Sequence, residues 1–213
     1  SEYEKALSAA GCEINFYALK EENDFALGDD YINVLEGGYD IVFLCSPNNP
    51  TGGELSEQCL LEIVTRCKRL GILPVIDMSF ADFSENTVSA NVLAEAGAAV
   101  IKAFTKIYAM PALRLGYMLC CDEELLGKVN LAGQSWSVNS LAQAAGAAAL
   151  DDSDFIGRTV EYISRERRFL TEKFGAMGIK TYPAAANFIL LKSEHDLADI
   201  AMESGIALRR CEN

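Results

Sequence analysis

The fold of this chain is decided by residues 40–77, which read DIVFLCSPNNPTGGELSEQCLLEIVTRCKRLGILPVID. The two ends of this stretch, residues 40–45 and 72–77, are short and apolar, as expected of strands that are covered on both faces of a sheet. Between them, Ser56–Leu70 places its apolar residues on one face of a helix, and Gly71 follows as a favourable helix end. A strand, a helix and a second strand at this spacing predict a parallel pair with the helix packed outside it.

The same alternation of apolar runs and helical stretches extends to about residue 121. Residues 99–104 and 115–120 are two further candidate strands, and residues 136–150 form an Ala-rich stretch that is predicted to be helical. The chain is therefore predicted to be an α/β protein, with a mostly parallel sheet and flanking helices over residues 1–150.

Residues 151–213 are predicted to form a smaller α+β domain. Its predicted helices are residues 155–177 and 196–204, and its predicted strands are residues 187–192 and 206–209. The chain begins within a helical stretch and stops directly after a strand-like run, so both domains are expected to be partial.

The composition excludes several classes of protein. The 213 residues include 18 Lys+Arg and 31 Asp+Glu, for a formal charge of −13, and 50% of them are hydrophobic. Such a chain can bury a core, and it repels the phosphates of nucleic acids and anionic membranes. No apolar run reaches the roughly 18 residues of a membrane-spanning helix, and the N-terminus has no secretory signal. We expect a cytoplasmic protein that binds neither nucleic acid nor membrane.

The cysteines and the single histidine argue against a metal centre. There are seven cysteines at irregular positions, with no CxxC pair and only His195 to complete a mixed site. A secreted disulfide framework and a zinc site are both disfavoured, and no metal is predicted. Reduced cysteines fit the cytoplasm.

Polar residues lie directly beside one end of each predicted strand. Asn49 lies in the SPNNPTG segment after the first strand, Asp77 ends the second, Thr105 and Lys106 follow the third, and Arg114 precedes the fourth. Ligands of α/β sheets bind at the carboxyl ends of the strands, so these side chains are expected at one rim. Each has an ordinary explanation as a turn, cap or solvated residue. The ordered set at successive strand ends is more specific than any one member.

Three segments carry a resemblance to a known family: Ser46–Gly52, the Asp77-Met-Ser-Phe80 box, and TKIYAMPALRLGY at residues 105–117. Together they resemble the fold-type I enzymes that depend on pyridoxal phosphate, the class I/II aminotransferase superfamily. The resemblance spans nearly the whole chain. Residues 106–117, Phe80 and the segment SWSVN at residues 135–139 are most similar to the branch that contains histidinol-phosphate aminotransferases and threonine-phosphate decarboxylases.

The resemblance implies a role for each residue at the rim. Lys106 is the catalytic residue that forms an aldimine with the cofactor, and its free amine moves the Cα proton. Asp77 pairs with the pyridine nitrogen, and Asn49 binds the 3-oxygen of the ring. Thr105 and Arg114 hold the phosphate.

Three further residues follow from the same resemblance. Phe80 packs near the cofactor ring, whereas Asn187 and Arg209 contact the substrate. The resemblance also implies that a helix N-terminus that cradles the phosphate, an arginine for the substrate carboxylate and a tyrosine from a second subunit lie outside residues 1–213. It implies a homodimer for the full-length parent.

Three functions stay open on the sequence alone. The leading one is an aminotransferase that acts at Cα of an amino acid or amino phosphate ester, a small-molecule substrate. The specific rival is decarboxylation of L-threonine O-3-phosphate in cobalamin biosynthesis. An alternative of another class is a catalytically silent fragment, or a binding module, that keeps the fold.

Overall fold

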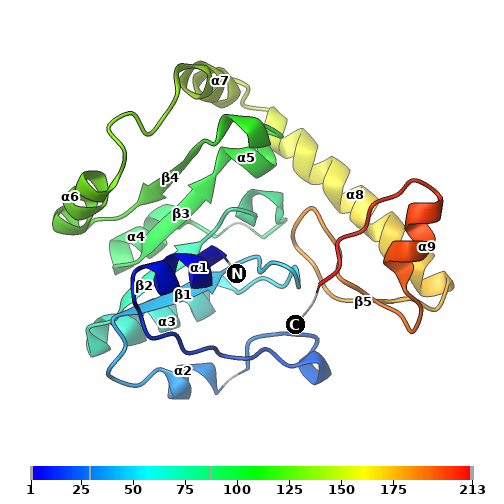
Figure 1. Ribbon diagram of the computed structural model, residues 1–213, viewed down its shortest axis with the longest axis horizontal. Helices are drawn as coiled ribbons and strands as arrows, with labels where there is room; N and C mark the ends of the chain where they lie inside the picture. The colour runs from blue at the N-terminus through cyan, green and yellow to red at the C-terminus, as the bar shows by residue number, and fades with distance from the viewer. Residues whose placement is uncertain (1, 29, 87, 212–213) are drawn as a thin grey trace.

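The sheet predicted from the sequence is present in the structure. The computed structural model describes residues 2–28, 30–86 and 88–211. Its main sheet has the order β1-β2-β3-β4, and the strands are β1 (Ile41–Cys45), β2 (Leu73–Asp77), β3 (Ala99–Ala103) and β4 (Gly116–Leu119). The first three strands are parallel, and β4 is antiparallel to β3. The prediction of a mostly parallel sheet with flanking helices is confirmed (Figure 1).

Helix α3 (Glu57–Leu70) connects β1 to β2 and packs on the sheet. Ser56 caps its first turn by accepting a hydrogen bond from the backbone of Cys59 at 3.2 Å, and Gly71 ends it in the left-handed conformation with φ 72°. Its apolar face joins β2, β3 and α4 (Ala90–Ala96) in one buried cluster. The members of this cluster are Leu60, Val64, Ile76, Met78, Leu93, Ala94, Ala98 and Val100.

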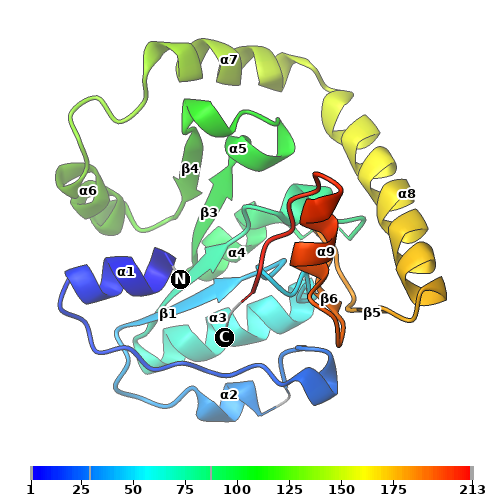
Figure 2. The same ribbon diagram turned by 45° about the vertical axis from the view of Figure 1, so that its right-hand side comes forward.

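The N-terminal part of the chain lies along one edge of this unit. Helix α1 (Glu2–Ala9) lies beside β1, and α2 (Tyr31–Val34) packs against α3 through a second buried cluster (Figure 2). The members of that cluster are Tyr31, Leu35, Ile63, Cys67 and Ile72.

The later helices lie at one end of the sheet and around its outside (Figure 2). They are α5 (Phe104–Ile107), α6 (Glu123–Ala132), α7 (Ser140–Asp151) and α8 (Phe155–Ala176). Figure 2 shows α6, α7 and α8 following one another around the outside of the sheet. A third buried cluster joins Phe80, Phe83 and Ile107 to Ala186, so the last part of the chain packs against the strand ends.

The C-terminal part differs from the expectation in its strands. Helix α9 (Leu197–Glu203) is present, but within the described residues the second sheet has only β5 (Lys180–Thr181) and β6 (Leu191–Lys192). The predicted strand at residues 206–209 is wrong, because that segment is irregular and exposed, and a strand needs a paired neighbour. The boundary near residue 150 stays a prediction. Within the described residues, no helix has the length and apolarity needed to cross a bilayer.

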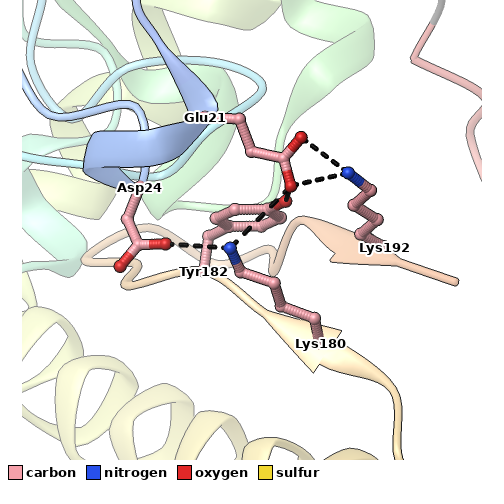
Figure 3. Close-up of polar contacts among 5 residues, drawn as sticks. All are labelled: Glu21, Asp24, Lys180, Tyr182 and Lys192. Carbon is pink, nitrogen blue, oxygen red and sulfur yellow. Dashed lines mark hydrogen bonds and ion pairs between the residues drawn. The ribbon is translucent and has the colours of Figure 1, made fainter.

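An ion cluster ties the N-terminal segment to this second sheet (Figure 3). The Glu21 carboxylate accepts hydrogen bonds from the Tyr182 hydroxyl at 2.7 Å and from Lys192 at 2.6 Å. Lys180 lies 3.2 Å from Asp24 and 4.4 Å from the centroid of the Tyr182 ring. The cluster therefore joins residues about 160 positions apart in the sequence.

Glu21→Gln is expected to weaken this junction in a pH-dependent way. The hydrogen bonds from Lys192 and then Tyr182 hold the pKa of Glu21 below its ordinary value of 4.5. A carboxyl whose folded pKa is depressed stabilises the fold above its unfolded pKa, and this contribution is lost as pH falls through the folded pKa. Thermal melts should therefore show a lower midpoint for the variant at pH 7, and this difference should shrink below about pH 4. The exposed Glu22→Gln is the matched control, and an equal effect there would contradict the assignment.

Candidate active site

The loop after β1 is held tightly between β2 and the C-terminal part of the chain. The backbone amide of Ser46 donates to the carbonyl of Asp77 at 3.0 Å, and the amide of Ala185 donates to the carbonyl of Gly52 at 2.8 Å. Gly52 has φ 78°, and a Cβ there would lie 2.6 Å from the Cβ of Ala184. Only glycine fits this position without strain. Asn49 lies exposed at the tip of this constrained loop.

Asp77 ends β2 at the centre of the same edge. It pairs in register with Cys45 of β1 and Ile101 of β3. One carboxylate oxygen accepts a hydrogen bond from the backbone of Ser79 at 2.8 Å, and the other accepts one from the hydroxyl of Tyr3. The carboxylate is thus fixed at both oxygens and remains half-buried.

Tyr3 is a residue of this site that the sequence patterns did not reveal. Its ring stacks on Phe43 of β1 with centroids 5.3 Å apart. Burial, reinforced by the charges of Cys45 and Asp77, raises the pKa of the Tyr3 hydroxyl well above its ordinary value. Tyr3 therefore stays protonated and keeps its donor toward Asp77. A contact across 74 residues leaves no local signal in the sequence.

Cys45 lies beside this pair but is poorly suited to nucleophilic chemistry. Burial, followed by the charge of Asp77, raises the pKa of its thiol to about 11. The thiolate is the reactive form of cysteine, so Cys45 is inert near neutral pH. Its Sγ lies 3.2 Å from the carbonyl of Pro47, which it donates to.

Lys106 lies on α5, at the edge where β3 ends. Lys106 is exposed, and its amine lies 5.5 Å from the centroid of the Phe80 ring, so the predicted lysine and the last residue of the Asp77 box are neighbours. Phe80 is buried and packs edge-to-face on Phe188 at 5.1 Å. Thr105 precedes Lys106 on α5 and is half-buried.

Arg114 reaches the same edge from the start of β4. The amide of Phe104 donates to the carbonyl of Leu115 at 3.1 Å, which joins the segment of Arg114 to the start of α5. Arg114 adopts the left-handed conformation with φ 57°, and its guanidinium donates to the carbonyl of Pro111 at 3.0 Å. The side chain is exposed.

The two predicted substrate residues are placed differently. Asn187 is exposed, and it lies between buried Ala186 and Phe188, whose ring packs on Phe80. It therefore lies close to the strand ends. Arg209 is exposed in the irregular segment after α9, and in the described part of the chain no hydrogen bond or ion pair joins it to the other predicted site residues.

Comparison with known proteins identifies the family of the chain. The sequence profile of the family described as Aminotransferase class I and II matches residues 1–212. The chain belongs to this family. It is 36% identical to the threonine-phosphate decarboxylase of Salmonella typhimurium, over 100% of this chain and 60% of that protein. It is 30% identical to the histidinol-phosphate aminotransferase of Methanococcoides burtonii, over 99% of this chain and 58% of that protein.

A solved structure supports the same assignment. The histidinol-phosphate aminotransferase from Clostridium acetobutylicum superposes with a TM-score of 0.90 at 26% identity, over 99% of this chain and 65% of that one. The chain thus spans about 60% of the length of the curated relatives it matches. Members of this aminotransferase family depend on pyridoxal phosphate.

The side chains at this edge fit that cofactor. Lys106 offers a primary amine for its aldehyde, Asp77 a carboxylate for its ring nitrogen, and Arg114 a guanidinium for its phosphate. An ionised carboxylate has about four acceptor sites, so Asp77 can accept another donor besides Ser79 and Tyr3.

A cavity elsewhere on the surface is separate from this edge. A cavity of about 560 Å³ lies between α2 and α3 and contains none of the predicted site residues. Among residues 2–28, 30–86 and 88–211, no group of three or more His, Cys, Asp or Glu side chains could hold a metal ion.

Proposed function

We propose that this aminotransferase-family chain binds pyridoxal phosphate at the edge formed by Asp77 and Lys106, and acts at Cα of an amino acid or amino phosphate ester. The bound cofactor supplies an electron-withdrawing ring that weakens the bonds at that carbon. The observation that carries the proposal is the position of the Lys106 amine, which lies 5.5 Å from the centroid of the Phe80 ring. Phe80 is the last residue of the box that starts at Asp77.

Asp77 and Lys106 have distinct roles in this proposal. Asp77, held by Ser79 and Tyr3, would offer its carboxylate to the ring nitrogen. Lys106 provides the amine that attaches the cofactor, and it is the base available at this edge for the Cα proton.

The remaining residues bind and orient. Asn49 offers an amide to the ring oxygen, and Thr105 with Arg114 offers a hydroxyl and a guanidinium to the phosphate. Phe80, buried against Phe188, presents an apolar wall that excludes water from one side. In the same proposal Asn187 and Arg209 contact the substrate.

Amino transfer is the leading reaction, and decarboxylation of a phosphorylated amino acid is the alternative. Both begin from the same bound amino acid, and the relatives named above carry one activity or the other. We further propose that the full-length parent is a homodimer in the cytoplasm. The proposed boundary between its two domains lies near residue 150 of this chain.

The test is chemical trapping followed by product analysis. Borohydride treatment of the chain with pyridoxal phosphate should leave the cofactor on Lys106, as located by peptide mass spectrometry. Turnover is assayed on a separate sample without borohydride, with histidinol phosphate plus 2-oxoglutarate and with O-phosphothreonine. Amino transfer supports the leading reaction, whereas release of carbon dioxide without amino transfer would replace it with the alternative.

A silent fragment that keeps the fold is the competing function, and one observation favours it. Five of the eight predicted site residues are exposed, namely Asn49, Lys106, Arg114, Asn187 and Arg209. Uniform labelling of surface lysines, with no preference for Lys106, would support the silent fragment and contradict the proposal.

A further inference from the structure

We propose that helix α7 sets the conformation of Arg114, and that Asn139 is the positioning residue through which it does so. This inference rests on the proposed function, in which Arg114 binds the phosphate of the cofactor. Figures 1 and 2 show α7 lying next to the segment that joins α5 to β4, where Arg114 is found.

Arg114 needs external support for its backbone. It adopts φ 57°, a left-handed conformation that is unfavourable for a residue with a Cβ. Such a conformation persists only where the surrounding structure determines it. The bond from its own guanidinium to Pro111 at 3.0 Å is local and constrains the side chain, and the flanking residues must therefore be held by something else.

Asn139 holds the residue before Arg114. Its amide nitrogen donates to the carbonyl of Leu113 at 3.1 Å, and its amide oxygen accepts from the backbone of Ala142 at 2.9 Å, capping α7. One side chain thus connects the start of a 12-residue helix to the peptide next to Arg114.

Gly146 of α7 lies close to Leu115, the residue after Arg114. A Cβ at Gly146 would lie 2.5 Å from a methyl carbon of Leu115, so the helix approaches this side chain closely. Ala142, one turn earlier on the same helix, is fully buried. Helix α7 therefore contacts the residues on both sides of Arg114, and the hydrogen bond from the amide of Phe104 to the carbonyl of Leu115 adds to this restraint.

The two functions of Asn139 can be separated by substitution. Asp caps a helix about as well as Asn, but a carboxylate cannot donate to the carbonyl of Leu113. Asn139→Asp should therefore keep the thermal midpoint while it releases Leu113. Asn139→Ala should lose both. Ser89→Ala removes a comparable cap from α4, a hydrogen bond from the backbone of Val92 that does not involve Leu113.

The first readout is the preference of the chain for pyridoxal phosphate over pyridoxal, which lacks the phosphate. Absorbance titrations give both dissociation constants. Asn139→Asp should reduce the preference about 3- to 10-fold, the usual range for one lost hydrogen bond, and should add nothing in an Arg114→Ala background. Ser89→Ala should leave the preference unchanged.

The second readout needs no cofactor. Amide hydrogen exchange of residues 111–116 should become faster in Asn139→Asp, while exchange within α7 stays as slow as before. Unchanged exchange and an unchanged preference in Asn139→Asp would overturn the inference. If Arg114→Ala itself leaves the preference unchanged, the proposed phosphate role of Arg114 fails, even where the exchange result upholds the link to α7.

Discussion

Replacement of Lys106 by alanine is expected to abolish covalent attachment of pyridoxal phosphate at this site. The variant lacks the amine that lies near Phe80, and no other side chain on α5 can replace it. Borohydride trapping should leave no cofactor at position 106. Any turnover should fall by at least about 10²-fold, the lower range for loss of a positioned general base.

Two further variants make this result specific. Lys106→Arg keeps the positive charge but has a guanidinium that stays protonated, so it should lose attachment as completely as the alanine variant. Lys128→Ala removes an exposed lysine that pairs with Glu124 at 2.7 Å, and labelling of Lys106 should be unaffected. Undiminished binding and trapping in Lys106→Ala would contradict the assignment of this residue.

Asp77→Asn is expected to weaken cofactor binding about 10- to 150-fold. The variant keeps the shape of the side chain but removes the charge offered to the ring nitrogen, and a hydrogen bond to a charged group contributes about 1.5–3 kcal/mol. Absorbance titration with pyridoxal phosphate measures the effect. The dissociation constant of the unaltered chain is the reference.

The controls distinguish charge at this edge from charge elsewhere on the sheet. Asp40→Asn changes an exposed carboxylate just before β1, at the opposite end of the strands, and should leave binding unchanged. Tyr3→Phe keeps the Asp77 carboxylate but removes one of its donors, so its effect should be smaller than that of Asp77→Asn. Equal effects of Asp40→Asn and Asp77→Asn would rule out a specific role for Asp77.

The sequence predicted those parts of the fold that depend on local signals. The apolar runs at 40–45 and 72–77 became β1 and β2, and Ser56 with Gly71 marked both ends of α3. Helix α6 was missed although Asp122 caps it by accepting from the backbone of Leu125 at 3.0 Å. A capping aspartate followed by two glutamates was the signal available there.

Contacts between segments that are distant in the sequence could not be predicted from such local signals. The hydrogen bond from Tyr3 to Asp77 and the cluster around Glu21 join parts of the chain whose proximity only the packed structure establishes. The segment at 206–209 is a short apolar run like a strand, but no pattern within a segment can supply the partner strand that it needs. Asp77 and Lys106 lie where β2 and β3 end, which is the edge at which α/β sheets bind ligands.

The close contact between Gly52 and Ala184 limits how this protein can be recombined. The loop after β1 and the segment before Ala186 meet with no room for one more carbon atom at position 52. A chimera that takes the loop after β1 from another protein must therefore bring glycine at position 52. A chimera that violates this rule would separate the Asn49 loop from the last part of the chain, whichever protein supplies the exchanged loop.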